Sequence, residues 1–254
     1  MVTTVLDKEI ENNYKHFLED WQDELTSSTK DIVKKTKTFQ DSYKRLTTLQ
    51  AWRAYILETN ISEDSFAFFL EAQNDALLSH VQASIGCWRM ALKSLRSCIE
   101  NSTLALYYMD HPVELALWSN GNFRISFRET ISYLTKHPSI SSLPKNSESI
   151  TGIPLLVNEY DKLSQAVHAS SRDFRMTDEG KAIAFWSSDA KRVGIWSTHE
   201  KRTIEGINLL FLNMFTKYLT GAKQSNLRTS LSFSIPKTKD AKIKSTLKVT
   251  IKRR

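Results

Sequence analysis

Apolar residues recur three or four positions apart over long stretches of this sequence, which is the period of an α-helix. The clearest run has spacings of four, four, three, four, three and four, at Leu77, Val81, Ile85, Trp88, Leu92, Leu95 and Ile99. The first 111 residues contain one glycine, Gly86, and no proline, so little in them would interrupt a helix. We therefore expect one long central helix from about Phe66 to about Tyr108, which His111-Pro112 ends.

Shorter helices are predicted in the second half of the chain. A capping box at residues 126–129 opens a short helix. Pro154 suits the first turn of another helix, which runs to His168. A second capping box at residues 197–200 opens a strongly apolar helix to about Leu219.

Two segments depart from the helical period. Residues 182–186 and 193–196 are apolar runs that predict a short hairpin. Near the C-terminus apolar and polar residues alternate, with apolar side chains at Leu231, Phe233, Ile235, Leu247, Val249 and Ile251. This alternation predicts a small two-stranded β-ribbon, with a solvated and partly ordered C-terminus as the alternative. The expected fold class is therefore mainly α, a helical bundle with one small β-ribbon.

Charge divides the chain at residue 222. Residues 223–254 contain ten Lys or Arg and one acid, a net charge of +9, whereas residues 1–222 contain 25 bases and 27 acids, a net charge of −2. We expect a helical domain over 1–222 and a basic ribbon or tail over 223–254. Docking on an acidic protein surface is one use for such a tail. Binding of nucleic acid is the expected one, through Lys242, Lys244, Lys248, Lys252, Arg253 and Arg254.

Composition limits the remaining possibilities. Cys87 and Cys98 are 11 residues apart in the predicted long helix, too far for a disulfide, and no apolar run is long enough to span a membrane. We expect a cytoplasmic protein with reduced thiols and no membrane contact. Neither His nor Cys residues have the spacing of a zinc site, and no glycine-rich phosphate loop occurs. We therefore predict no metal and no cofactor.

Two groups of polar residues are candidates for a catalytic site. Arg96 and Glu100 are four residues apart and share one face of the predicted long helix. Tyr160, Ser164 and His168 share a face of a later helix at steps of four. Together they could bind a phosphodiester, with the histidine as general acid or base. A structural network between two packed helices is the alternative.

The same residues carry a family resemblance. An "LRSxxE" pattern at residues 95–100 and "YxxLSxxVH" at 160–168 resemble the HEPN superfamily of helical domains, in its abortive-infection and uncharacterised bacterial branch, over roughly residues 66–219. The resemblance implies a helical bundle, frequent dimerisation and, in active members, metal-independent RNA cleavage by an Arg that precedes a His by four to six residues.

This chain departs from that pattern. The positions upstream of His168 hold Asp161, Lys162 and Leu163, and lysine lacks the guanidinium fork that grips a phosphate. The pair Arg192 and His199 fits the spacing, but roughly one such match is expected by chance in this composition.

Two functions are consistent with these observations. The first is a bacterial defence or stress protein that binds RNA or DNA through its basic segment, as a toxin-like ribonuclease. The second is a non-catalytic adaptor subunit, whose helices hold a protein partner while its tail holds nucleic acid. Either function leaves room for a homo-oligomer.

Overall fold

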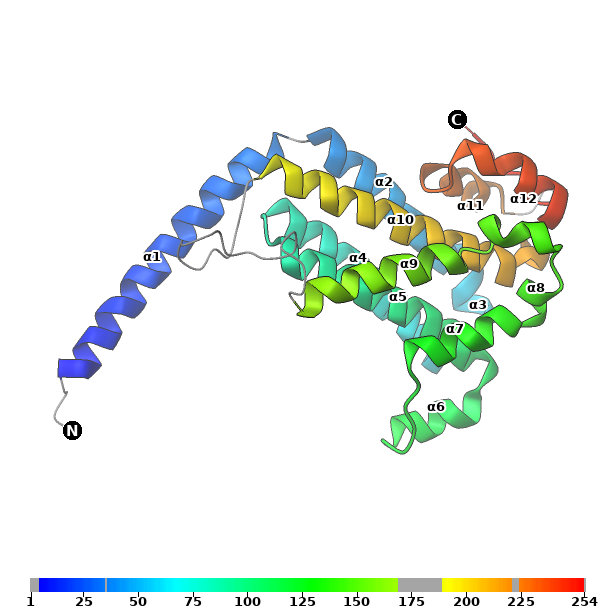
Figure 1. The fold of residues 1–254 in the computed structure, drawn as a ribbon, viewed down its shortest axis with the longest axis horizontal. Helices are drawn as coiled ribbons and strands as arrows, with labels where there is room; N and C mark the ends of the chain where they lie inside the picture. The colour runs from blue at the N-terminus through cyan, green and yellow to red at the C-terminus, as the bar shows by residue number, and fades with distance from the viewer. Residues whose placement is uncertain (1–4, 35, 169–188, 221–223, 254) are drawn as a thin grey trace.

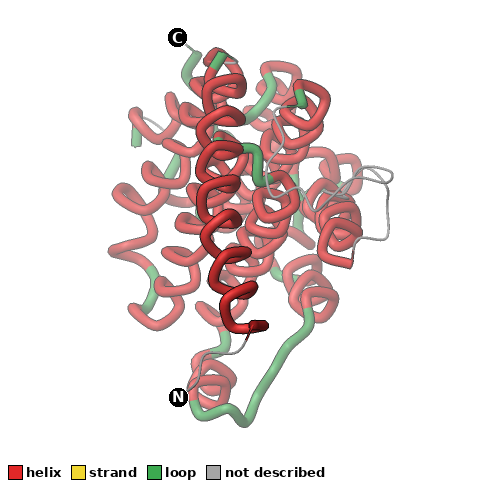
Figure 2. The backbone as a smooth tube through the Cα atoms, turned by 90° about the vertical axis from the view of Figure 1, so that its left-hand side faces the viewer, coloured by secondary structure: helices red, strands yellow, loops and turns green. Residues whose placement is uncertain are grey.

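The computed structural model describes residues 5–34, 36–168, 189–220 and 224–253, and these residues form a helical bundle from which α1 projects (Figure 1). Figure 2 shows helices and loops but no strand among the residues described. The predicted mainly α fold class is confirmed. The longer helices are α1 (Val5–Val33), α2 (Thr36–Trp52), α4 (Glu63–Ser84), α5 (Trp88–Asp110), α9 (Ile153–His168) and α10 (Ala190–Met214).

Short elements connect the long helices. A π-helical turn, Arg53–Leu57, and α3 (Glu58–Asn60) link α2 to α4. Between α5 and α9 lie α6 (Pro112–Ser119), α7 (Phe127–Lys136), α8 (Pro138–Ser141) and a 3-10 turn, Lys145–Ile150. The capping box predicted at the start of α7 is confirmed, because Ser126 Oγ accepts from the Glu129 backbone and Glu129 accepts from the Ser126 backbone.

The long central helix predicted from about residue 66 to 108 is wrong. The chain turns back at Gly86, which has φ +80°, and α4 and α5 pack against each other as a hairpin. A left-handed residue ends a helix, and glycine adopts that conformation without steric cost. The turn changes which apolar positions are buried: Trp88, Leu92, Leu95 and Ile99 on α5 are in the core, whereas Leu77 and Val81 on α4 are exposed.

Helix α10 is the central helix of the molecule. Every residue from 203 to 215 is buried, and α10 contacts α2, α5 and α9. The predicted helix start at residue 197 is wrong, because α10 begins at Ala190 with Asp189 as its N-cap. Residues 193–196, predicted as one strand of a hairpin, belong to this helix. The other predicted strand, residues 182–186, lies outside the described residues.

The predicted C-terminal β-ribbon is also wrong. Residues 224–253 form α11 (Ser225–Ser230), two 3-10 turns (Leu231–Phe233 and Lys237–Lys239), α12 (Asp240–Leu247) and an extended end. Leu231, Ile235, Val249 and Ile251 are all buried in the same core as the long helices. The alternation that predicted strands arises because helical turns and an extended segment both bury apolar side chains against α2 and α10.

Two further findings concern the whole described chain. Both cysteines are free thiols, with Cys98 buried in the core. No described helix is both long enough and apolar enough to cross a membrane.

Candidate functional site

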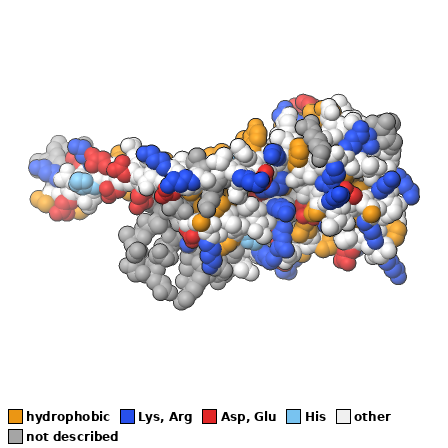
Figure 3. Space-filling view, turned by 90° about the horizontal axis from the view of Figure 1, so that it is seen from above, with side chains coloured by type: hydrophobic (Ala, Val, Ile, Leu, Met, Phe, Trp, Pro, Cys, Tyr) orange, Lys and Arg blue, Asp and Glu red, His pale blue; other side chains and the backbone are white. Residues whose placement is uncertain are grey.

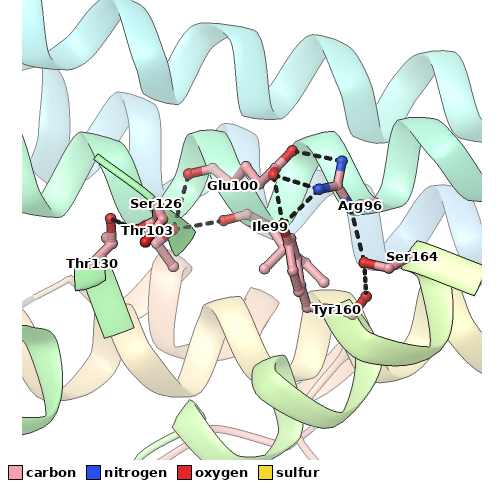
Figure 4. Close-up of polar contacts among 8 residues, drawn as sticks. All are labelled: Arg96, Ile99, Glu100, Thr103, Ser126, Thr130, Tyr160 and Ser164. Carbon is pink, nitrogen blue, oxygen red and sulfur yellow. Dashed lines mark hydrogen bonds and ion pairs between the residues drawn. The ribbon is translucent and has the colours of Figure 1, made fainter. Parts of the chain in front are cut away.

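Four of the predicted site residues meet where α5 packs against α9 (Figure 4). Arg96 donates from Nε to Ser164 Oγ (3.1 Å), and its two terminal nitrogens donate to Glu100 (3.3 Å) and to the Tyr160 hydroxyl (2.5 Å). The Tyr160 hydroxyl in turn donates to Glu100 Oε1 (3.0 Å). The i, i+4 spacing on each helix therefore places all four side chains in one network, as the sequence predicts. Their catalytic role stays a prediction.

The tyrosine in this network is held in its neutral form. Phe127 of α7 stacks on the Tyr160 ring with 3.8 Å between ring centroids. Burial, and then the negative charge of Glu100, raise the pKa of Tyr160. A neutral hydroxyl can accept from Arg96 and donate to Glu100 at the same time, which is the arrangement observed.

The network lies at the edge of the bundle. The side chains of Arg96 and Glu100 are 26% and 31% exposed. A cavity of about 160 Å³ lies next to Glu100, with Asn101 and Thr130 among its polar walls. That volume is below the roughly 300–1,000 Å³ of usual small-molecule sites.

The predicted general acid or base cannot be placed in the network. His168 is the last residue of α9, and its backbone lies one turn beyond Ser164. Its side chain is outside the described part of the chain.

A second polar cluster, which sequence reasoning missed, joins α9 to α10. Glu159 is fully buried and contacts His199 Nδ1 (2.6 Å) and Arg202 (3.2 Å). The capping box predicted at residues 197–200 would place His199 in the first turn of a helix, but it lies in the third turn of α10. The contact joins residues 40 positions apart, so no local pattern could have predicted it.

A third cluster surrounds Glu200 at the contact of α2 with α10. Its carboxylate accepts from Arg45 Nε (2.8 Å) and from Ser42 Oγ (3.2 Å), and Ser42 Oγ also contacts His80 Nδ1 (2.9 Å). Burial raises the pKa of Glu200 to about 7, although Arg45 and Ser42 act in the opposite direction. The sequence predicts Glu200 as the acidic residue of a capping box. The buried position follows instead from the earlier start of α10.

The predicted nucleic-acid contacts divide into two groups. Lys244, Lys248 and Lys252 are exposed, and Lys242 is partly exposed. Arg253 pairs with Asp240 and donates to the backbone carbonyls of Ser232 and Ile235, and its contact with nucleic acid stays a prediction. Arg254 lies outside the described residues.

Comparison of the chain with protein-family models, with curated proteins and with solved structures gives no match. No family is shown. The resemblance to HEPN domains therefore stays a hypothesis that rests on the two short motifs.

Proposed function

We propose that this protein is a non-catalytic helical adaptor that holds nucleic acid on its basic C-terminal surface and a partner protein elsewhere. The observation that supports the nucleic-acid part most directly is the position of four lysines on and beside α12: Lys242, Lys244, Lys248 and Lys252. None of these amino groups forms an ion pair with a described residue. Two of them donate only to neutral oxygens, at Ser245 and Ser225.

The charge of this basic surface is not neutralised by the acids that the structure describes around it. Asp240 is the single acid of residues 223–254, and Arg253 already occupies it. Lys239 pairs with Glu205 of α10 and also contacts a backbone carbonyl, so it does not add to the exposed charge. Lys237, in the 3-10 turn directly before α12, is also exposed. It and the four lysines on and beside α12 are placed to contact phosphates, which bind such surfaces without regard to sequence.

The state of the Arg96 network favours an adaptor over an enzyme. All three guanidinium nitrogens of Arg96 already have partners, in Ser164, Glu100 and Tyr160. A phosphate could bind there only after those contacts were broken. In this proposal the network joins α5 to α9 as a structural element, which is the alternative that the sequence leaves open.

The salt dependence of binding tests the proposed surface. In the variant with Lys242, Lys244, Lys248 and Lys252 changed to Gln, the slope of log affinity against log salt should fall by up to about 3, since each phosphate contact contributes about 0.7–0.9. Single-stranded RNA and duplex DNA probes would both be measured. The control changes Lys37, Lys136, Lys191 and Lys201 to Gln, which removes the same charge from other exposed positions. Equal slopes for the two variants would reject the surface.

A ribonuclease of the HEPN-like type is the second candidate, with the defence role that the resemblance implies. The partial exposure of Arg96 and Glu100 favours it, because RNA can reach those groups at the edge of the bundle. In that case Arg96→Ala should abolish cleavage of labelled RNA in EDTA, and Arg128→Ala, at an exposed position, should not. Absence of cleavage by the unmodified protein would reject this candidate while leaving the adaptor intact.

A further inference from the structure

Helix α1 carries an apolar stripe with an 11-residue repeat. The spacings along it are four, four, three, four, four, three and four. Seven apolar residues and one serine occupy these positions: Leu6, Ile10, Tyr14, Phe17, Trp21, Leu25, Ser28 and Ile32. An 11-residue repeat has 3.67 residues per turn, close to the 3.6 of an α-helix, so the stripe runs nearly straight along one face.

The two ends of this stripe have different surroundings. Ser28 and Ile32 are buried against the bundle, where Ser28 donates to the Ile85 carbonyl at the end of α4. Toward the N-terminus the helix projects beyond the bundle (Figures 1 and 3). There Leu6, Ile10 and Tyr14 are 62%, 56% and 60% exposed. The C-terminal end of the stripe thus packs against the bundle of this chain. Its N-terminal part is exposed and could pack against another molecule.

The charges beside the stripe restrict what can cover it. At about 100° per residue, Glu11, Asp20 and Glu24 border the stripe, while the three lysines of α1, Lys8, Lys15 and Lys30, lie on the opposite face. An acidic border repels nucleic acid and anionic lipid surfaces. It also disfavours a second copy of α1, because the borders of both stripes would be acidic.

We infer that α1 is a docking helix for a basic amphipathic helix of a partner protein, one with an apolar ridge bordered by Lys or Arg. Such a helix would pack its ridge on the stripe and place its cations beside Glu11, Asp20 and Glu24. This inference rests on the adaptor function proposed above, and it names the chemistry of the protein partner.

A synthetic helical peptide provides the probe. It carries leucines at the same 11-residue repeat with lysines on both borders, and a second peptide carries glutamates there instead. Anisotropy with the full-length protein should show binding of the lysine peptide and not of the glutamate peptide. Changing Glu11 and Asp20 to Lys should lower affinity for the lysine peptide at least tenfold and create affinity for the glutamate peptide. The matched control, Glu19→Lys with Asp23→Lys, makes the same charge change on the opposite face and should retain the original preference.

Three outcomes would overturn the inference. One is no binding of either peptide, and another is an equal loss of affinity in both charge-reversed proteins. The third is a dimer of the unmodified protein that Ile10→Gln with Tyr14→Gln converts to a monomer. Nucleic-acid affinity, measured on the same proteins, tells the two proposals apart: if the docking helix is wrong but the basic surface is right, that affinity stays and keeps its dependence on the α12 lysines.

Discussion

At the scale of single residues, two buried carboxylates could not be predicted from the sequence. Glu159 and Glu200 are both almost fully buried. Each has a polar neighbour in the sequence, so the local pattern does not indicate burial. Their partners come from other helices, and removal of one partner would leave a charge without compensation in the core. These clusters therefore join α2 and α9 to α10 through buried polar contacts.

The raised pKa of Glu200 predicts how stability depends on pH. A pKa of about 7 in the folded protein, against an ordinary 4.5, means that the folded state binds the extra proton between those values. Protonation of Glu200 therefore adds up to about 3 kcal/mol to the free energy of unfolding. This contribution is complete below about pH 4.5 and is lost as pH rises through 7. Urea unfolding of the unmodified protein and of Glu200→Gln, from pH 5 to pH 8, measures it. As pH rises, the free energy of unfolding of the unmodified protein should fall relative to that of Glu200→Gln. Parallel pH dependences of the two free energies would contradict this prediction.

At the scale of elements, the start of α9 lies in tight backbone contact with α10. Gly152 has φ +81°, and a Cβ placed on it would lie 2.3 Å from the carbonyl oxygen of Gly206. The positive φ and the close carbonyl oxygen are both features of the backbone. The backbone cannot relieve them without separating the two helices. Gly121 has a similar φ, +74°, but a Cβ there would meet nothing within 4 Å.

These two glycines form a matched pair for mutation. Gly121→Ala should cost about 1 kcal/mol, the penalty of a left-handed conformation for a residue with a Cβ. Gly152→Ala adds the collision with α10 and should cost about 3 kcal/mol or more. The midpoints of urea unfolding report both values. Similar losses for the two variants would show that α9 and α10 are not in this close contact.

The sequence predicted local features well and long-range ones poorly. The capping box at Ser126 is correct because its two partners are three residues apart. The second proposed box failed because His199 and Glu200 bind Glu159 and Arg45, which are distant in sequence. The Arg96 network was predictable because each of its helices shows the spacing by itself. The alternation of apolar and polar residues near residue 249 predicts a strand wrongly, because an extended segment buried against helices shows the same pattern.

At the scale of the whole molecule, charge is separated along its length. Helix α1 has three lysines and eight acids, a net charge of 3 − 8 = −5, whereas residues 223–254 have a net charge of +9. Helices α11 and α12 lie at the end of the molecule opposite the tip of α1 (Figure 1). Such a separation orients an approaching polyanion toward the basic end and keeps it from the acidic helix. The proposed adaptor, with two unlike partners at its two ends, is consistent with that distribution.

The central claim is that nucleic acid binds the lysines on and beside α12, and lysine footprinting tests it on the unmodified protein. Amine acetylation, read by mass spectrometry with and without saturating single-stranded RNA or duplex DNA, reports the protection of each exposed amino group. The account predicts protection of Lys242, Lys244, Lys248 and Lys252, and unchanged reactivity at Lys37, Lys136, Lys191 and Lys201. Equal protection of both groups, or protection of the second group alone, would contradict it.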